Sequence, residues 1–155
     1  MLHQSRSDAR LGSLLVALQF VLLAWLAVEG VRGLAAGRLP IDAIVLAVAA
    51  VVLGLWALSA NRLGNFNIRP MPRAGGQLVQ QGPYRWIRHP MYSALLLAGA
   101  GAARIAGDAT AWLVLAALAA VLIVKSRVEE RGMLAQHAGY REYQARTRRF
   151  VPWLY

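Results

Sequence analysis

The sequence predicts an all-α, polytopic membrane protein with about four transmembrane helices and a C-terminal cytoplasmic amphipathic helix. Of its 155 residues, 58% are hydrophobic, whereas soluble domains are about 45–50% apolar. The excess is gathered into four blocks, and most charged residues lie between or after these blocks. A chain of this length predicts a single domain over residues 1–155. Cysteine is absent, which excludes disulfides, a thiol nucleophile and a cysteine metal site.

The four apolar blocks are the predicted transmembrane segments. Crossing about 30 Å of hydrocarbon takes about 20 helical residues, a length that the first two blocks reach. The last two blocks are shorter and predict a tight helical hairpin, and the alanine and glycine of residues 98–103 predict close helix packing. The blocks are residues 11–31, interrupted only by Gln19, residues 41–60, residues 91–105, and residues 109–124 after the turn-like Gly107-Asp108.

The first block is preceded by Arg6 and Arg10, as the apolar core of a signal peptide would be. Its apolar run is longer than the core of about 7–15 residues that such peptides have. We therefore expect a retained membrane anchor at this position.

The basic residues predict the orientation in the membrane. Fourteen of them lie before the first block, between the second and third blocks, or after the fourth. Because cytoplasmic loops carry the excess of lysine and arginine, we expect both termini and the middle loop in the cytoplasm, and the protein in the inner (cytoplasmic) membrane. The formal charge of +10 is then a topology signal, and no nucleic-acid partner is expected. On the opposite side lie Arg32, Arg38 and Arg104, and we expect the hairpin to reach that interface at Arg104 and Asp108.

The segment between the second and third blocks carries unusual chemistry. Residues 61–81 are predicted to form a loop, in which Pro70 and Pro72 keep the chain extended along the membrane face. Residues 82–92 then contain two prolines, two tyrosines, two arginines and a histidine. This combination predicts a preorganised pocket at the membrane surface, with Pro90 as the first residue of the third helix.

After the fourth block the chain becomes polar. We expect residues 125–149 to form an amphipathic helix that continues from the last span. Lys125 shares a face of this helix with Glu129, and Ser126 shares one with Glu130, because residues four apart are neighbours on a helix. Residues 146–155 mix cations with aromatic side chains, which is typical of anchoring at an anionic membrane surface.

The motifs of the second half, taken together, resemble one enzyme family. The order of these motifs over residues 78–153 resembles that of the isoprenylcysteine carboxyl methyltransferase family, which itself resembles the phospholipid N-methyltransferases. The first two spans are similar in hydropathy only. The motifs are Leu78-Val79, Gly82-Pro83-Tyr84 and Arg88-His89-Pro90-Met91-Tyr92, followed after a hydrophobic hairpin by Glu129-Glu130 and Tyr140-x-x-Tyr143.

The resemblance implies an integral membrane enzyme that transfers a methyl group from S-adenosylmethionine to a lipophilic small molecule or lipid. Residues 1–60 would be two N-terminal spans, and residues 61–155 the cofactor-binding and catalytic part. The cofactor would lie on the cytoplasmic side. The implied cofactor contacts are Leu78, Val79, Tyr84, Arg88, His89, Pro90, Met91, Tyr92 and Glu129.

The resemblance also implies a basic residue, typically arginine, one turn before the glutamate to meet the substrate. That position is Lys125 here. Lysine lacks the planar fork of arginine, so Arg127 is a competing candidate. The family's Phe-Gly before the paired tyrosines is replaced by His137-Ala138-Gly139.

These residue types suit methyl transfer. The reaction is an in-line displacement that depends on alignment in a dry pocket more than on acid–base groups. Glu129 can accept hydrogen bonds from the cofactor's ammonium or ribose, and aromatic faces suit a cation or adenine. A carboxylate acceptor needs a cation to hold it and no base, whereas an amine acceptor needs a base such as Glu130. Both acceptor classes stay open, as does the oligomeric state.

Two other functions are compatible with the sequence. Membrane sterol-type reductases resemble this family in the C-terminal box and would use NADPH, although this chain is short and has no separate dinucleotide-binding fingerprint. A small membrane assembly or maturation factor would use the box only to shape a protein-binding surface. No metal site is expected, because nothing near His3 or His137 completes a ligand set.

Overall fold

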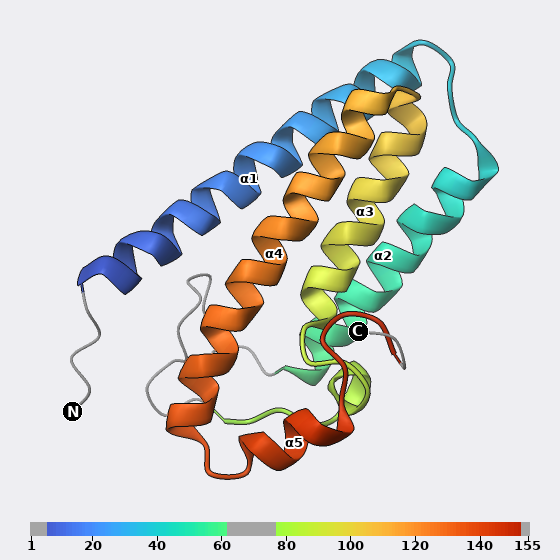
Figure 1. Cartoon of the computed structure of the whole chain (residues 1–155). Coiled ribbons are helices and arrows are strands. Elements are labelled where there is room, and N and C mark those ends of the chain that lie inside the picture. The colour runs from blue at the N-terminus through green and yellow to red at the C-terminus, as the bar shows by residue number, and fades with distance from the viewer. Residues whose placement is uncertain (1–5, 62–76, 153–155) are drawn as a thin grey trace.

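The computed structural model describes residues 6–61 and 77–152 as a bundle of long helices (Figure 1). Within these ranges the regular structure is helical, which confirms the all-α prediction. The predicted course of Pro70 and Pro72 and most of the aromatic C-terminal anchor lie outside the described residues. The elements are α1 (Arg6–Ala35), α2 (Ile41–Ala60), the short 3₁₀ helix η1 (Gly82–Arg85), α3 (Pro90–Ala106), α4 (Ala109–Gln136) and α5 (Tyr140–Arg146).

Three of the described helices are long and apolar enough to cross a membrane. They are α4, α2 and the part of α1 from residue 10 onward. Helix α3 has 17 residues, which at 1.5 Å per residue gives about 26 Å and falls short of the hydrocarbon core of about 30 Å. Membrane helices are therefore confirmed for three segments, and the fourth complete span stays a prediction.

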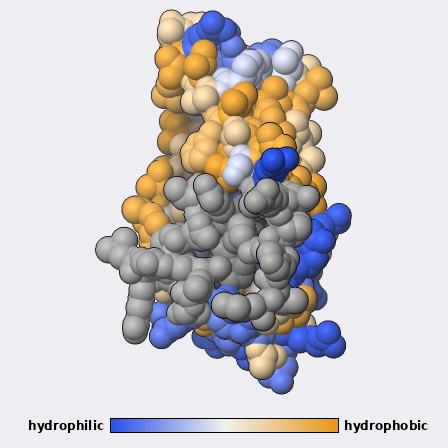
Figure 2. All heavy atoms as spheres, turned by 90° about the vertical axis from the view of Figure 1, so that its left-hand side faces the viewer, coloured by the Kyte–Doolittle hydropathy of each residue, from blue (hydrophilic) through white to orange (hydrophobic). Residues whose placement is uncertain are grey.

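The outer surface of the bundle is apolar, as contact with lipid requires. Figure 2 shows a broad hydrophobic zone between hydrophilic residues at the two ends of the molecule. Large apolar side chains point outward on all three long helices, for example Leu14, Val45 and Leu113. Water-soluble monomers rarely expose so large an apolar area, so this surface fits a lipid bilayer.

Helix α3 is the central helix of the bundle and contacts α1, α2 and α4. Its small residues let the neighbouring backbones approach closely. A Cβ added at Gly101 would lie 3.3 Å from the carbonyl oxygen of Ala43 on α2, and one added at Gly30 of α1 would lie 3.3 Å from the Cβ of Ala102. The alanine- and glycine-rich stretch thus has the packing role expected of it.

Helices α3 and α4 form an antiparallel hairpin (Figure 1). Gly107 provides the turn with a left-handed φ of 73°, and Asp108 caps α4 by accepting a 2.9 Å hydrogen bond from the backbone N–H of Ala111. At this end Arg104 forms a 2.6 Å ion pair with Asp42. The pair ties the end of α3 to the first turn of α2.

Helix α4 continues past the apolar block that ends at residue 124 and ends at Gln136. The amphipathic helix expected over residues 125–149 is therefore divided into an extension of α4, a break at residues 137–139, and α5. Gly139 lies in the break, where its low helix propensity of about 1 kcal/mol relative to alanine disfavours a continuous helix. The chain after α5 returns to the ends of α2 and α3 (Figure 1).

Candidate active site

The box of residues 82–92 lies at the end of the bundle where α2 ends and α3 begins. Gly82 has a left-handed φ of 59°, and a Cβ there would lie 2.8 Å from the Cβ of Ala60, so only glycine fits. Pro83 is the second residue of η1, and Pro90 starts α3 as predicted. Because proline fixes φ at the first turn of a helix, the two rings restrain the chain between them.

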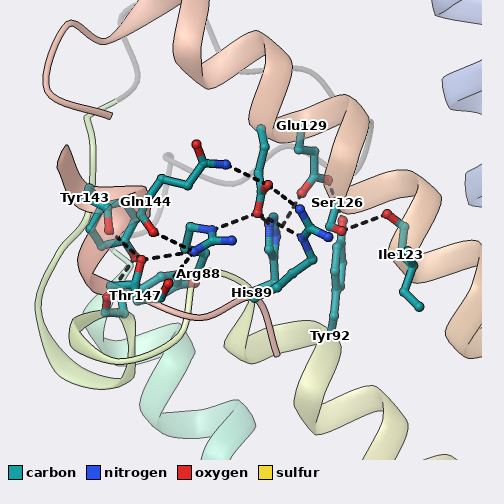
Figure 3. Close-up of polar contacts among 12 residues, drawn as sticks. Arg88, His89, Tyr92, Ile123, Ser126, Glu129, Tyr143, Gln144 and Thr147 are labelled. Carbon is teal, nitrogen blue, oxygen red and sulfur yellow. Dashed lines mark hydrogen bonds and ion pairs between the residues drawn. The ribbon is translucent and has the colours of Figure 1, made fainter. Parts of the chain in front are cut away.

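Arg88 joins segments that are distant in sequence (Figure 3). Its Nε donates a 2.8 Å hydrogen bond to Glu130 of α4. Its Nη1 donates to the backbone oxygens of Thr147 at 2.6 Å and Gln144 at 3.2 Å. A planar guanidinium with five donors suits such a junction. These donors point at protein groups, so the geometry favours a bracing role for Arg88 over direct contact with a cofactor.

Glu130 is the centre of this network. Besides the bond from Arg88, its carboxylate accepts hydrogen bonds from Arg149 Nη2 at 2.8 Å and from Gln144 Nε2 at 3.1 Å. The side chain is only 4% exposed. A buried carboxylate is tolerated when cations and hydrogen bonds compensate its charge. Glu130 therefore attaches the chain that follows α5 to α4.

Residues 147–150, which we call the C-terminal strap, run beside residues 86–89. The backbone N–H of Arg88 donates to the oxygen of Arg148 at 2.8 Å, and that of Arg148 donates to the oxygen of Trp86 at 2.9 Å. The two segments form a parallel β-bridge. At the end of the strap, the ring of Phe150 packs edge-on against that of His89 with the centroids 5.9 Å apart. The strap thus covers one side of the box.

His89 lies between the two adjacent glutamates of α4. Its Nδ1 is 3.3 Å from Glu129 and its Nε2 is 3.1 Å from Glu130. Burial opposes protonation, but the hydrogen bonds to the two carboxylates outweigh it and raise the pKa of His89 above its ordinary 6.5. The folded protein therefore favours the imidazolium more than an unfolded chain does.

Tyr92, in the first turn of α3, connects this helix to Glu129. Its hydroxyl donates a hydrogen bond to the Glu129 carboxylate, and its ring stacks on that of His89 with the centroids 5.3 Å apart. The box and the acidic pair, which lie on opposite sides of the hairpin in sequence, thus meet directly.

Lys125 lies one turn before Glu129 on α4 and is buried. Its Nζ donates a 2.8 Å hydrogen bond to Gln19 of α1 and lies 5.1 Å from the ring centroid of Tyr92, a cation–π distance. Arg127 is exposed and points about 200° around the helix from Lys125. Of the two basic candidates, the structure therefore brings Lys125 to the site and leaves Arg127 outside.

The other expected cofactor contacts form a neighbouring cluster. Tyr84 is buried against the end of α2, and Val79 and Met91 pack against it. Burial raises the pKa of Tyr84 to about 12, so its hydroxyl stays protonated. Leu78 is half-buried in the segment before η1, and Pro90 is buried. The structure brings Val79, Tyr84 and Met91 together beside the His89 network rather than within it.

Four residues of the network were not identified from the sequence. Gln19 carried a visible signal, because it is the single polar interruption of the first apolar block. The others lie in a polar C-terminal stretch, where nothing in the sequence separates a residue that contacts Glu130 from one that faces water. The four are Gln19, Gln144, Thr147 and Arg149.

Comparison with known protein families gives a match of residues 42–135 to the isoprenylcysteine carboxyl methyltransferase (ICMT) family. The chain belongs to the ICMT family. The matched residues include the second span, the box and both glutamates. The motifs in the sequence resemble the family over residues 78–153, so the match begins earlier in the chain and ends before the last of these motifs. Helix α5 and the C-terminal strap lie outside the match. No curated protein matches the chain.

Membership of the ICMT family indicates a membrane methyltransferase, and methyltransferases of this family generally use S-adenosylmethionine. The donor set fits such a cofactor. Glu129 is 20% exposed. Among the described residues, each of its oxygens has one polar partner, Tyr92 or His89, which leaves a second lone pair on each oxygen. Those free positions suit an ammonium or ribose hydroxyl, and the neighbouring aromatic faces suit a sulfonium or adenine.

Proposed function

We propose that this ICMT-family protein catalyses S-adenosylmethionine-dependent methyl transfer to the carboxylate of a lipophilic acceptor at the cytoplasmic face of the membrane. The observation that carries the proposal is the hydrogen bond from the Tyr92 hydroxyl to Glu129, which joins the box and α4 in one polar cluster. The cluster lies at the end of the bundle that the positive-inside rule assigns to the cytoplasm. The bound cofactor supplies a methyl group activated by its sulfonium.

Glu129 and the aromatic residues beside it are the proposed cofactor contacts. Glu129 accepts hydrogen bonds from the amino or ribose end, and the faces of Tyr92 and His89 lie against the cationic or adenine part. Val79, Tyr84 and Met91 offer an adjoining apolar surface, as nucleotide sites commonly do. Leu78 and Pro90 are neighbours that shape this surface.

Arg88 and Glu130 have a positioning role in this proposal. Their hydrogen bonds attach the C-terminal strap to α4 and so keep His89 between the two glutamates. Glu130 was the candidate base for an amine acceptor. Because its oxygens already accept bonds from two arginines, His89 and Gln144, it is poorly placed to take a proton. Its contacts therefore support anchoring rather than base catalysis.

Lys125 favours an anionic acceptor. Among the described residues, its contacts are the neutral amide of Gln19 and the face of Tyr92, and Glu129 acts on it only through space, without an ion pair. A buried cation that no ion pair neutralises attracts an anion. A carboxylate is ionised at neutral pH and needs no base before it accepts a methyl group. Because Lys125 lies where α4 packs on α1, the acceptor's apolar chain would remain in the bilayer while its carboxylate reaches the ammonium.

Methyl transfer to matched acceptors tests the proposal. The purified full chain in detergent is incubated with S-adenosylmethionine that carries a tritiated methyl group, and with hexadecanoate, S-farnesyl-N-acetylcysteine or hexadecylamine. We expect label in base-labile esters of the carboxylates and none in the amine, and loss of label with His89→Ala and Glu129→Ala. Label in the amine alone would refute a carboxylate acceptor. Binding of NADPH instead would favour a reductase, and full biological activity of both variants would favour an assembly factor.

A further inference from the structure

Gln19 is a buried polar residue on a helix that exposes many of its large apolar side chains. Leu18 and Phe20 are 46% and 54% exposed, whereas Gln19 is 6% exposed. Helix α1 thus turns this one amide inward, toward α4. An amide inside the membrane costs free energy unless it has a hydrogen-bond partner, and a leucine would fill the same space without that cost. Gln19 is therefore expected to form a hydrogen bond that a leucine at this position could not form.

The partner of Gln19 is Lys125, which lies 106 positions later in the sequence. Gln19 Oε1 accepts a 2.8 Å hydrogen bond from Lys125 Nζ. In the described part of the chain, the ion pairs do not include Lys125, although Glu129 lies one turn away on the same helix. Because the amide is neutral, it orients the ammonium without cancelling its charge.

Lysine and glutamate four residues apart on a helix commonly form a pair. In this chain Glu129 is turned to Tyr92 and His89, and Lys125 is turned to Gln19. In the described part of the chain the two charges therefore form no ion pair, although Glu129 acts on Lys125 through space. We propose that Gln19 is a positioning residue that draws Lys125 away from Glu129. The ammonium is then available to the acceptor's carboxylate, and Glu129 is available to the cofactor. The inference rests on the proposed function and extends the site to α1, outside the matched residues 42–135.

Three substitutions of Gln19 and one control test this role. Gln19→Glu places a carboxylate on the ammonium and neutralises it, and Gln19→Leu removes the hydrogen-bond acceptor. Gln19→Asn keeps the amide but shortens the side chain by one methylene, so the contact with Lys125 is lost or lengthened. Leu18→Ala is the matched control, because Leu18 lies next to Gln19 on α1 and is exposed.

The measurements separate acceptor binding, turnover and cofactor binding. They are the KM for hexadecanoate, kcat, and the Kd for S-adenosylhomocysteine by calorimetry, which needs no turnover. We expect Gln19→Glu to raise the KM on the order of tenfold, as for loss of one charge-assisted contact, with little change in the Kd. Gln19→Leu frees Lys125 to pair with Glu129, so both the KM and the Kd should rise. If the role of Gln19 were purely structural, the variants would lower the Tm, and they would not differ in whether the KM alone or both the KM and the Kd rise.

The outcomes distinguish the inference from the proposed function. Unchanged KM and Kd in Gln19→Glu and Gln19→Leu, with an active wild-type protein, would overturn the inference and leave the proposed function standing. A wild-type chain that neither binds S-adenosylhomocysteine nor transfers a methyl group would overturn both. If Gln19→Glu and Gln19→Leu fail to fold, the KM of Gln19→Asn for hexadecanoate decides. It should be higher than the KM of Leu18→Ala, and an equal KM would overturn the inference.

Discussion

Glu130→Gln is expected to release the C-terminal strap while the helices of the bundle stay in place. Glutamine keeps the shape of the side chain but removes its charge and replaces one oxygen by an amide nitrogen, which cannot accept from a guanidinium. In the wild-type protein the carboxylate has Arg88 and Arg149 each at 2.8 Å. Both guanidinium groups lose their counter-charge in the variant.

The size of the effect follows from burial. Breaking a buried ion pair by removing one partner costs about 3–5 kcal/mol. The side chains of Arg88 and Arg149 are 9% and 16% exposed, so water recovers part of the lost interaction, and about 3 kcal/mol is the expected cost. At about 1.4 kcal/mol for each factor of ten, the strap should open about 100-fold more often than in the wild-type protein.

Hydrogen exchange measures this opening directly. The backbone N–H groups of Arg88 and His89 donate to strap oxygens at 2.8 and 3.0 Å, so their exchange should accelerate about 100-fold, while amides in the middle of α2 keep their wild-type rates. Glu129→Gln is the matched control. It makes the same chemical change one residue earlier, where the partners are Tyr92 and His89 rather than the strap.

Exchange of the Arg88 and His89 amides within a few-fold of wild type in Glu130→Gln would refute the anchoring role of Glu130. Equal acceleration in Glu129→Gln would refute the division of roles between the two glutamates, because that residue makes no contact with the strap in the described network.

Three other properties of the fold and site can be tested by unfolding in detergent. The pKa of His89 is raised in the folded protein, so protonated His89 stabilises the fold fully below pH 6.5, and this stabilisation is lost as pH rises through the higher folded pKa. The Tm of the wild-type protein should therefore fall over that pH range, and the Tm of His89→Gln should stay flat. At Gly33 an added Cβ would lie 2.7 Å from the carbonyl carbon of Ile105, so Gly33→Ala should cost about 1–3 kcal/mol. Gly54→Ala, whose added Cβ has its nearest neighbour at 3.7 Å, should stay within about 0.5 kcal/mol of wild type. Asp108→Ala removes the cap of α4 and should cost about 1 kcal/mol; an unchanged unfolding free energy would show that the cap is dispensable.

Most helix boundaries were predictable because local chemistry sets them. Helix α2 occupies the apolar block of residues 41–60, and α3 begins at Pro90. Gly107 and Asp108 end one helix and cap the next. Each of these features depends on residues that are adjacent in sequence, so no knowledge of the tertiary structure is needed.

The different environments of Glu129 and Glu130 were not predictable. Adjacent residues on a helix point about 100° apart, so one glutamate faces Tyr92 and the other faces the strap. Which glutamate takes which role depends on where Arg149 returns to α4. That return follows the break between α4 and α5 and a parallel bridge between Ile87 and Arg148, two segments without a strand pattern in the sequence.

The preference for Lys125 over Arg127 was available from spacing, because Lys125 and Glu129 are four residues apart and share a helix face. Its contact with Gln19 joins residues 106 positions apart. Such a pairing depends on how α1 docks against α4, and the sequence signal was only a polar residue within an apolar block.

Calorimetric titration of the purified full chain with S-adenosylhomocysteine tests the central claim most directly. The account predicts saturable binding by the wild-type protein, a Kd weakened on the order of tenfold or more in Glu129→Gln through loss of a charge-assisted contact, and an unchanged Kd in Arg127→Ala. Absence of binding by the wild-type chain, or undiminished binding by Glu129→Gln, would contradict it.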